Sequence, residues 1–227
     1  MKYKKYFDFV DIELVAMTQP LKINPDTGKL LTPQEFIAYT ARVSNPSNQM
    51  NTLTADKLLN YCIQKKHWSI FQMVSMCFEI NTTRDIGRQI LRHHFDFQEY
   101  SARYADPTQD LDFVVREARL QDTKNRQNSI EIDENNPIVA DWYNMQIEAI
   151  DDATKRYKKA LEMGVAKENA RSVLPEGNTC TRMYMSGHLR SFIHYCEVRE
   201  DASTQKEHRI IAEKIKAKLR EHFSFLV

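Results

Sequence analysis

Residues 92–104 read RHHFDFQEYSARY, which is the most distinctive stretch of the chain. It holds two arginines, two histidines, two carboxylates and a serine among four aromatic rings. The guanidinium of Arg103 matches two phosphate oxygens and the Ser101 hydroxyl can donate to a third, which suits a phosphate. Rings beside cations suit a planar, phosphorylated ligand. A solvated arginine face with structural histidines is the alternative.

The residues before this stretch predict a short helix over 83–91. Thr82 or Thr83 can cap it, and Asp85 suits its first turn. The arginines spaced to share one face and end at the stretch are Arg84, Arg88 and Arg92.

The residues after it, 98–104, predict an extended segment. In a strand, Glu99, Ser101 and Arg103 point to one side. An acid, a hydroxyl and a guanidinium would then stand in a row.

Composition limits the class of protein. The chain has 227 residues, enough for one domain with a substantial core. Its 32 lysines and arginines balance 31 acids, and a net charge of +1 argues against a protein that wraps a nucleic acid backbone. With five glycines and no Gly-rich phosphate motif, any nucleotide must bind without those loops.

The cysteines are Cys62, Cys77, Cys180 and Cys196. No pair has a C-x-x-C or usual zinc spacing, which favours buried thiols in a reducing cytosol over a disulfide or metal site. We expect no metal and no membrane association. We expect a cytoplasmic location, in the host cytoplasm if the source is a virus.

Alternating and helical apolar periodicities predict a mixture of strands and helices. The expected strands are residues 9–17, 74–80, 111–115 and 178–185. The expected helices are 54–66 capped by Thr54, 137–163 ended by Gly164, 167–174, one starting at Thr32-Pro33, and one capped by Ser203 or Thr204 whose core stripe is Ile211, Ile215, Leu219 and Phe223. Residues 116–128 are polar and read as a solvated excursion.

The central stretch resembles the signature of the flavin-dependent thymidylate synthases, which has the form R-H-R-x-x-S-x-N-x-x-S-x-R. The matching positions are Arg92-His93, Gln98-Glu99, Ser101 and Arg103. Two departures occur. His94 replaces the usual third arginine, and the loop to Phe97 is one residue short, with Asp96 nearest to the motif's first serine.

Further segments resemble the family in the same order along the chain. They are ARVS at 41–44, HWSIF at 67–71, ARSVLP at 170–175, HLRSFIH at 188–194 and VREDASTQKE at 198–207. For two arginines in these segments, a purely structural role is the alternative to ligand binding. Arg171 would cap helix carbonyls, and Arg199 would pair with Glu197, Glu200 or Asp201.

The resemblance implies an α+β fold with an antiparallel-type sheet packed with helices, and a homotetramer whose active sites are shared between subunits. It implies a single domain over 1–227, in which 105–136 reads as an insertion. The implied reaction is reductive methylation of dUMP to dTMP. Methylenetetrahydrofolate would supply the carbon, and FAD reduced by NADPH would supply the hydride.

The resemblance also assigns residues to roles. Those implied to hold the cofactors are Ser44, His67, Ser69, Arg92, His93, His94, Gln98, Glu99, His188, Arg190 and His194. Those implied to bind the nucleotide are Gln89, Arg92, Glu99, Tyr100, Ser101, Ala102, Arg103, Arg171 and Arg199. Arg199 is the expected catalytic residue, because a fixed cation beside the uracil stabilises negative charge at N3 and O2.

Two alternatives remain open at this point. The His94 replacement and the shortened loop would also suit a relative that hydroxymethylates the pyrimidine. A non-enzymatic nucleotide- or RNA-binding module would use the same basic and aromatic residues, although the balanced charge speaks against it.

Overall fold

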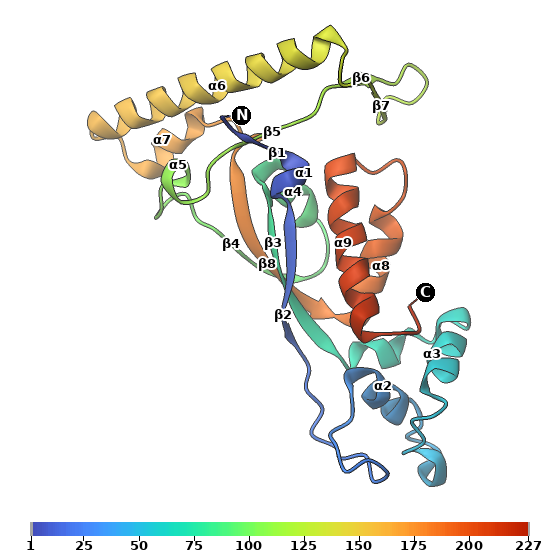
Figure 1. The fold of residues 1–227 in the computed structure, drawn as a ribbon. Helices are drawn as coiled ribbons and strands as arrows, with labels where there is room; N and C mark the ends of the chain where they lie inside the picture. Colours follow the sequence, from blue (N-terminus) through green and yellow to red (C-terminus); the bar gives the residue numbers. More distant parts are fainter. Residues whose placement is uncertain (1, 227) are drawn as a thin grey trace.

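A four-stranded antiparallel sheet forms the centre of the computed structural model, which describes residues 2–226 (Figure 1). Its strand order is β2 (Asp11–Met17), β3 (Ser75–Thr83), β8 (Cys180–His188) and β4 (Asp96–Glu99). The β3 and β8 strands pair along their whole length, from Ser75 opposite His188 to Thr83 opposite Cys180. The expected α+β fold with an antiparallel sheet is confirmed.

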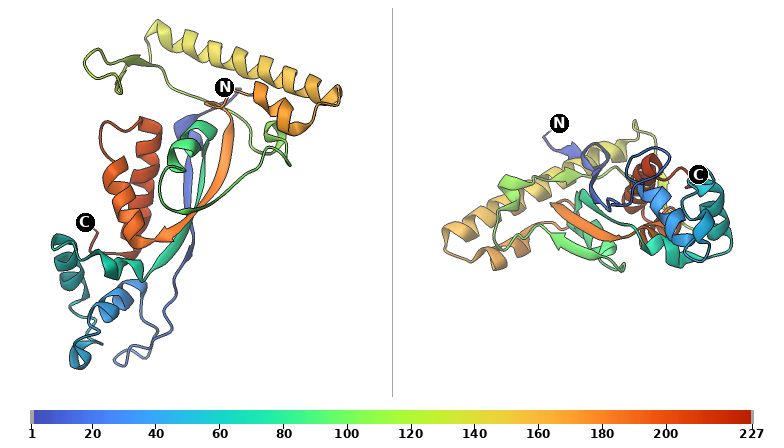
Figure 2. Two further views of the ribbon diagram at one scale, coloured as in Figure 1. Left: turned by 180° about the vertical axis from the view of Figure 1, so that it is seen from behind. Right: turned by 90° about the horizontal axis from the view of Figure 1, so that it is seen from below.

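Two long helices near the C-terminus, α8 (Leu189–Arg199) and α9 (Lys206–His222), lie side by side against one face of the sheet (Figure 2). The strand β3 alternates, as its sequence predicts, with every second side chain buried beneath these helices. The core side chains from the three elements include Met76, Phe78, Ile80, Phe192, Ile211, Ile215 and Leu219. The expected core stripe of the last helix is confirmed, including Phe223.

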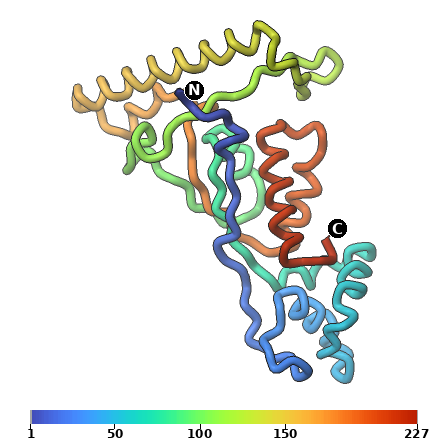
Figure 3. The backbone as a smooth tube through the Cα atoms, in the orientation of Figure 1, coloured from blue at the N-terminus to red at the C-terminus, as the bar shows by residue number. Residues whose placement is uncertain are grey.

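The remaining elements lie mainly at the two ends of the sheet. They are β1 (Lys4–Lys5), α1 (Tyr6–Phe9), α2 (Pro33–Ala41), η1 (Pro46–Asn48), α3 (Ala55–Gln64), η2 (Trp68–Gln72), α4 (Arg84–Ile90), α5 (Pro107–Asp110), β5 (Val114–Val115), β6 (Arg119–Gln121), β7 (Ser129–Glu131), α6 (Pro137–Glu162), α7 (Lys167–Ala170) and η3 (Arg171–Val173). The helices α6 and α7 lie at one end, and α2 and α3 at the other (Figure 3).

Two helix starts follow the expected capping chemistry. The Thr32 hydroxyl accepts from the Glu35 backbone N–H at 3.2 Å, and the Glu35 carboxylate accepts from the Thr32 N–H at 2.8 Å, which forms a capping box. Asn136 caps α6 through the Ile138 N–H. Gly164 follows the same helix with a φ of +83°, a conformation that favours glycine.

Three expected hydroxyl caps are wrong. The Thr83 hydroxyl donates to the Asp85 carboxylate at 2.6 Å, and the Thr54 hydroxyl accepts from Arg42 at 2.8 Å. Neither hydroxyl binds a helix N–H, because each is taken by another side chain. The last helix is preceded by Gln205, and Ser203 instead bonds Asp201.

The expected extended segment at 98–104 is also wrong beyond Glu99. Pairing of β4 with β8 stops there, and the chain turns, with the Tyr104 and Ala105 N–H groups donating to the Ser101 carbonyl. The Ser101 hydroxyl accepts from the Arg103 N–H at 3.4 Å, a local bond that favours a turn over a strand. Glu99, Ser101 and Arg103 therefore do not form a row.

Some boundaries differ by a few residues from the prediction. Phe9 belongs to α1 rather than to the first strand, the predicted strand 111–115 is reduced to β5, and β8 runs to His188. Over the described part of the chain, 2–226, every helix is too short or too polar to cross a membrane. The interpretation of 105–136 as an insertion stays a prediction.

Candidate active site

The short helix α4 lies between two groups of polar side chains. Its Ile86 and Ile90 are buried in the core and fix its orientation. On one side, Arg84 and Arg88 approach the carboxylate of Glu176 at 3.8 and 3.4 Å. On another side, Gln89 bonds Gln205, which precedes α9, and His208 within α9.

The first group lines a cavity of about 370 Å³, here called the arginine cavity. Its polar lining residues are Arg84, Arg88, Glu168, Arg171, Ser172, Glu176 and Thr179. Three guanidiniums face two carboxylates, so the lining carries an excess of positive charge that suits a phosphate. Arg171 also donates from Nε to the Glu168 carbonyl at 3.3 Å, so the expected helix-end contact exists as well.

The turn after β4 reaches this cavity. Ala102 is buried and lines it, and Arg103 pairs with Glu168 at 3.6 Å. Tyr100 donates its hydroxyl to Asp110 at 2.7 Å. The structure thus brings Ala102 and its neighbours Ser101 and Arg103 close to Arg171, although they are far apart in sequence.

The second group, here called the Arg199 cluster, comprises Arg199, His93, Tyr195, His208 and Gln89. Arg199 Nε donates to His93 Nε2 at 2.7 Å. Burial, and then the charge of Arg199, lowers the pKa of His93 to about 4, so its imidazole is neutral at pH 7. A neutral imidazole that accepts at Nε2 must carry its proton at Nδ1.

The acidic partners proposed for Arg199 are engaged elsewhere. Glu200 pairs with Lys216 at 2.5 Å, Glu197 contacts His194 at 3.1 Å, and Asp201 bonds Ser203. Within residues 2–226 no carboxylate pairs with Arg199, so the alternative of a structural ion pair is wrong. The guanidinium keeps a full positive charge next to a neutral acceptor.

Glu99 ends β4 close to α4. Its carboxylate accepts from the Thr181 hydroxyl at 2.9 Å, and a Cβ placed on Gly87 would lie 3.6 Å from the same oxygen. The strand pairing of β4 with β8 therefore fixes the Glu99 carboxylate against the helix that carries Gln89.

The third group, here called the α8 cluster, comprises His67, Ser69, His188, Arg190 and His194. The element η2, which carries Ser69, packs on α8, where the Trp68 ring lies 4.4 Å from that of His194. His188 Nδ1 lies 3.0 Å from the Ser75 hydroxyl, at the paired ends of β3 and β8. Five of the residues assigned to the cofactors are thus gathered at one end of the sheet.

The donor set of the α8 cluster fits an anionic, heteroaromatic cofactor. Arg190 supplies a permanent cation, and the imidazoles and the Ser69 hydroxyl both donate and accept. His67, Ser69 and His188 are exposed, and their side chains are accessible to a ligand. The Phe95 ring fills the space above Gly187 and so holds the loop that precedes β4 against β8.

Other assigned cofactor residues lie outside the α8 cluster. Arg92, His94 and Gln98 are exposed, and Ser44 is exposed beyond α2. Figure 1 places α2 at the end of the molecule opposite α7, next to which Arg171 lies. One chain therefore does not bring Ser44 to the arginine cavity.

Sequence reasoning missed several residues at these groups. His208 is fully buried, and it interrupts an apolar stripe that continues through Ile211, Ile215 and Leu219. A polar residue in such a stripe could have indicated a buried histidine. Arg116 and Arg119 are not solvated as expected, with side chains 13% and 12% exposed. Their partners, Asp85 and Glu207, lie far away in sequence and gave no local signal.

Comparisons with known proteins agree with the family that the motifs indicate. The family model described as "Thymidylate synthase complementing protein" (Thy1) matches residues 29–223. A flavin-dependent thymidylate synthase of Synechocystis sp. is 47% identical over 94% of this chain and 96% of its own length. A probable flavin-dependent thymidylate synthase of Paramecium bursaria Chlorella virus 1 is 45% identical over 86% of this chain and 87% of its own.

Solved structures agree on the fold. A UMP/dUMP methylase, PolB of Streptomyces cacaoi, matches with a TM-score of 0.78 over 96% of this chain and 92% of that one. At 22% identity this likeness concerns the fold. The family model and the two curated relatives span most of the sequence, and the chain belongs to the flavin-dependent thymidylate synthase family.

Proposed function

We propose that this chain converts dUMP to dTMP, with methylenetetrahydrofolate as carbon donor and FAD and NADPH as the source of the hydride. Family membership over residues 29–223 supports the reaction. In the structure, the observation that supports this reaction is the Arg199 cluster. There, a guanidinium without an acidic partner in residues 2–226 faces a neutral histidine. Such a cation can stabilise charge that develops on a pyrimidine ring.

The nucleotide's phosphate is assigned to the arginine cavity. Arg84, Arg88 and Arg171 supply the positive charge there, and the adjoining turn supplies the Ser101 hydroxyl. Arg199 holds the uracil and stabilises negative charge that develops at N3 and O2, which favours the electron-rich form of the ring in which C5 is the better nucleophile. Gln89 and Glu99 orient the nucleotide between the arginine cavity and Arg199.

Bound FAD supplies the hydride in this reaction. The residues of this chain that would hold it are those of the α8 cluster, with Arg92, His93, His94, Gln98 and Ser44 added from the other segments. No cysteine is assigned a role as nucleophile. Burial raises the pKa of Cys180 and of Cys196 to about 12, so these thiols stay protonated.

We further propose a homotetramer in which each active site is completed by neighbouring subunits. The helices α2 and α7, which Ser44 and Arg171 follow in the chain, lie at opposite ends of the structure, and this supports a site assembled from several copies. The four unbonded cysteines support a cytoplasmic location, because free thiols are typical of a reducing compartment.

The test is a reaction of the purified protein with dUMP, methylenetetrahydrofolate, FAD and NADPH, analysed by mass spectrometry. We expect dTMP, and no product when FAD is left out. A hydroxymethylated nucleotide would instead establish the related reaction. A protein that neither binds FAD nor forms a product would contradict the proposal.

A further inference from the structure

A chain of hydrogen bonds, here called the relay, links α8 to the start of α9 through α4. The Tyr195 hydroxyl lies 2.9 Å from His208 Nε2, and His208 Nδ1 lies 3.2 Å from Gln89 Oε1. Gln89 Nε2 donates to Gln205 Oε1 at 2.7 Å. Gln205 Nε2 donates to Glu207 Oε2 at 2.9 Å. Each member is bonded to the next, and all come from buried or half-buried positions.

Chemistry gives the relay one direction. A carboxylate only accepts, so Gln205 must donate to Glu207 and can then accept from Gln89. Gln89 in turn presents its carbonyl to the Nδ1–H of His208, which leaves His208 Nε2 to accept from the Tyr195 hydroxyl. Burial, and then the charge of Arg199, lowers the pKa of His208 to about 3, which keeps this imidazole neutral as the direction requires.

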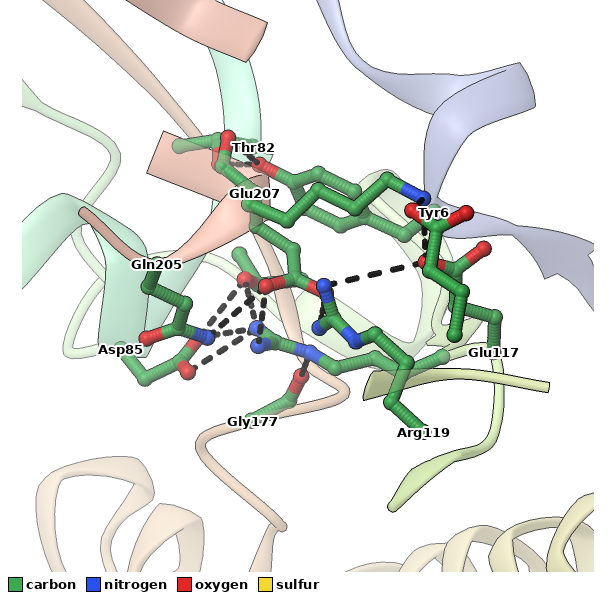
Figure 4. A network of polar contacts seen from close by, with 12 residues as sticks. Tyr6, Thr82, Asp85, Glu117, Arg119, Gly177, Gln205 and Glu207 are labelled. Carbon is green, nitrogen blue, oxygen red and sulfur yellow. Dashed lines mark hydrogen bonds and ion pairs between the residues drawn. The ribbon is translucent and has the colours of Figure 1, made fainter. Parts of the chain in front are cut away.

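The acceptor end of the relay is fixed by two arginines from the segment 114–121. Glu207 is 0% exposed and bonds Arg119, while Arg116 Nη1 lies 3.8 Å from its other oxygen (Figure 4). Arg116 is itself held by Asp85 at 2.7 and 2.9 Å. Because moving Glu207 away would leave a buried charge without its partner, the carboxylate has little freedom to move.

The other end of the relay lies within the Arg199 cluster, to which Tyr195, His208 and Gln89 belong. The Tyr195 ring meets the His93 ring edge-on at 4.9 Å, and His93 accepts from Arg199. Between the two ends lies Gln89, the side chain assigned to the nucleotide. A primary amide has two N–H bonds, and within residues 2–226 the relay uses one of those on Gln89, which leaves one for a ligand.

We propose that Gln205 and Glu207 are positioning residues, which act through the relay to fix the orientation of the Gln89 amide at the nucleotide. The inference rests on the proposed function, because the role of Gln89 comes from it. Without the relay, the amide can rotate and present its oxygen where the nucleotide needs a donor. Arg116 and Arg119 of the segment 114–121 then contribute to the site, because they hold Glu207 at the fixed end of the relay.

The first test is the substitution Gln205→Met, which removes the amide and leaves the contacts of Glu207 with Arg116 and Arg119 in place. We expect kcat/KM for dUMP to fall about 10- to 100-fold, because misorientation of a ligand-binding group has this size of effect. Most of the loss should appear as a raised KM, since Gln89 binds the nucleotide and does not react.

The matched control is Gln34→Met. Gln34 is a half-buried glutamine like Gln205, and its amide bonds Asp56 and Ser224, neither of which is bonded to a member of the relay within residues 2–226. It should lower thermal stability while it leaves kcat/KM unchanged. Equal losses of activity in the two variants would mean that general loosening is the cause, and would overturn the proposal.

The second test needs neither substrate nor cofactor. Nitrogen chemical shifts of ¹⁵N-labelled histidines report which imidazole nitrogen carries the proton. In the unmodified protein His208 should be a single neutral tautomer protonated at Nδ1, and in Gln205→Met a mixture. Protonation at Nε2 in the unmodified protein, or an unchanged signal in the variant, would overturn the relay. If the protein makes no dTMP, the proposed function fails while this measurement still decides the relay.

Discussion

Replacing Arg199 with methionine should change the pKa of His93, and the size of that change tests the electrostatics of the Arg199 cluster. The methionine keeps a long side chain but removes the cation that donates to His93 at 2.7 Å. Burial is the largest cause of the low pKa of His93, and the charge of Arg199 is the next. The substitution removes the second cause and leaves the first.

The size of the change follows from the contact. Two charges at hydrogen-bond distance interact by several kcal/mol even at an effective dielectric constant of about 20, and about 1.4 kcal/mol corresponds to one pKa unit. The pKa of His93 should therefore rise from about 4 by at least roughly one unit. It should stay below 6.5 because the ring remains partly buried. The same substitution should lower kcat about 10²- to 10³-fold, as the loss of a charge-stabilising donor does.

The assay is an NMR titration of the histidine ring signals, paired with steady-state kinetics. Arg92→Met is the control for the titration, because Arg92 lowers the pKa of His93 less than Arg199 does and its removal should give a smaller rise. A His93 pKa that stays at about 4 in Arg199→Met would refute the electrostatic account. A kcat within a few-fold of the unmodified enzyme would refute the catalytic role.

Three more predictions follow from the described contacts. Arg171→Met should raise KM for dUMP about 10- to 100-fold, which corresponds to the loss of one charged hydrogen bond. An unchanged KM would contradict the assignment of the phosphate to the arginine cavity. His93 and His208 bind protons in the unfolded chain below about pH 6.5 but stay neutral in the folded protein, so the free energy of unfolding should fall as the pH drops from 6.5 to 4, by on the order of 3 kcal/mol from His208 alone. Urea unfolding at several pH values checks this, and His208→Phe should flatten the profile. Gly187→Ala places a Cβ 2.5 Å from the Phe95 ring and should destabilise by about 1–3 kcal/mol, whereas Gly177→Ala, with 4.0 Å to its nearest atom, should cost less than about 0.5 kcal/mol in the same denaturant assay.

Much of the fold was predictable because its signals are local. The alternation in β3 and the apolar stripe of α9 each arise from the repeat of one element, and the Thr32 capping box uses residues three apart. The failures share a cause that is not local. Thr54 and Thr83 look like caps in sequence, but Arg42, 12 residues away, donates to the Thr54 hydroxyl and Arg116, 33 residues away, donates to the Thr83 hydroxyl.

The polar network around Glu207 could not be predicted for the same reason. Arg119 and Glu207 are 88 residues apart, and a polar segment such as 116–128 is usually solvated. The family motifs identify the residue types of the site in order along the chain, and their assignment to a site stays a prediction. The motifs do not say how the residues are distributed, and the structure places many of them in the arginine cavity, the Arg199 cluster and the α8 cluster.

The convergence of these three groups on one nucleotide and one flavin stays a prediction, and a crystal structure of the protein with FAD and dUMP tests it most directly. We predict that the phosphate lies among Arg84, Arg88 and Arg171, and that the uracil lies against an Arg199 of the same or a neighbouring subunit. A nucleotide bound away from Arg171 and Arg199 in every subunit would contradict the account.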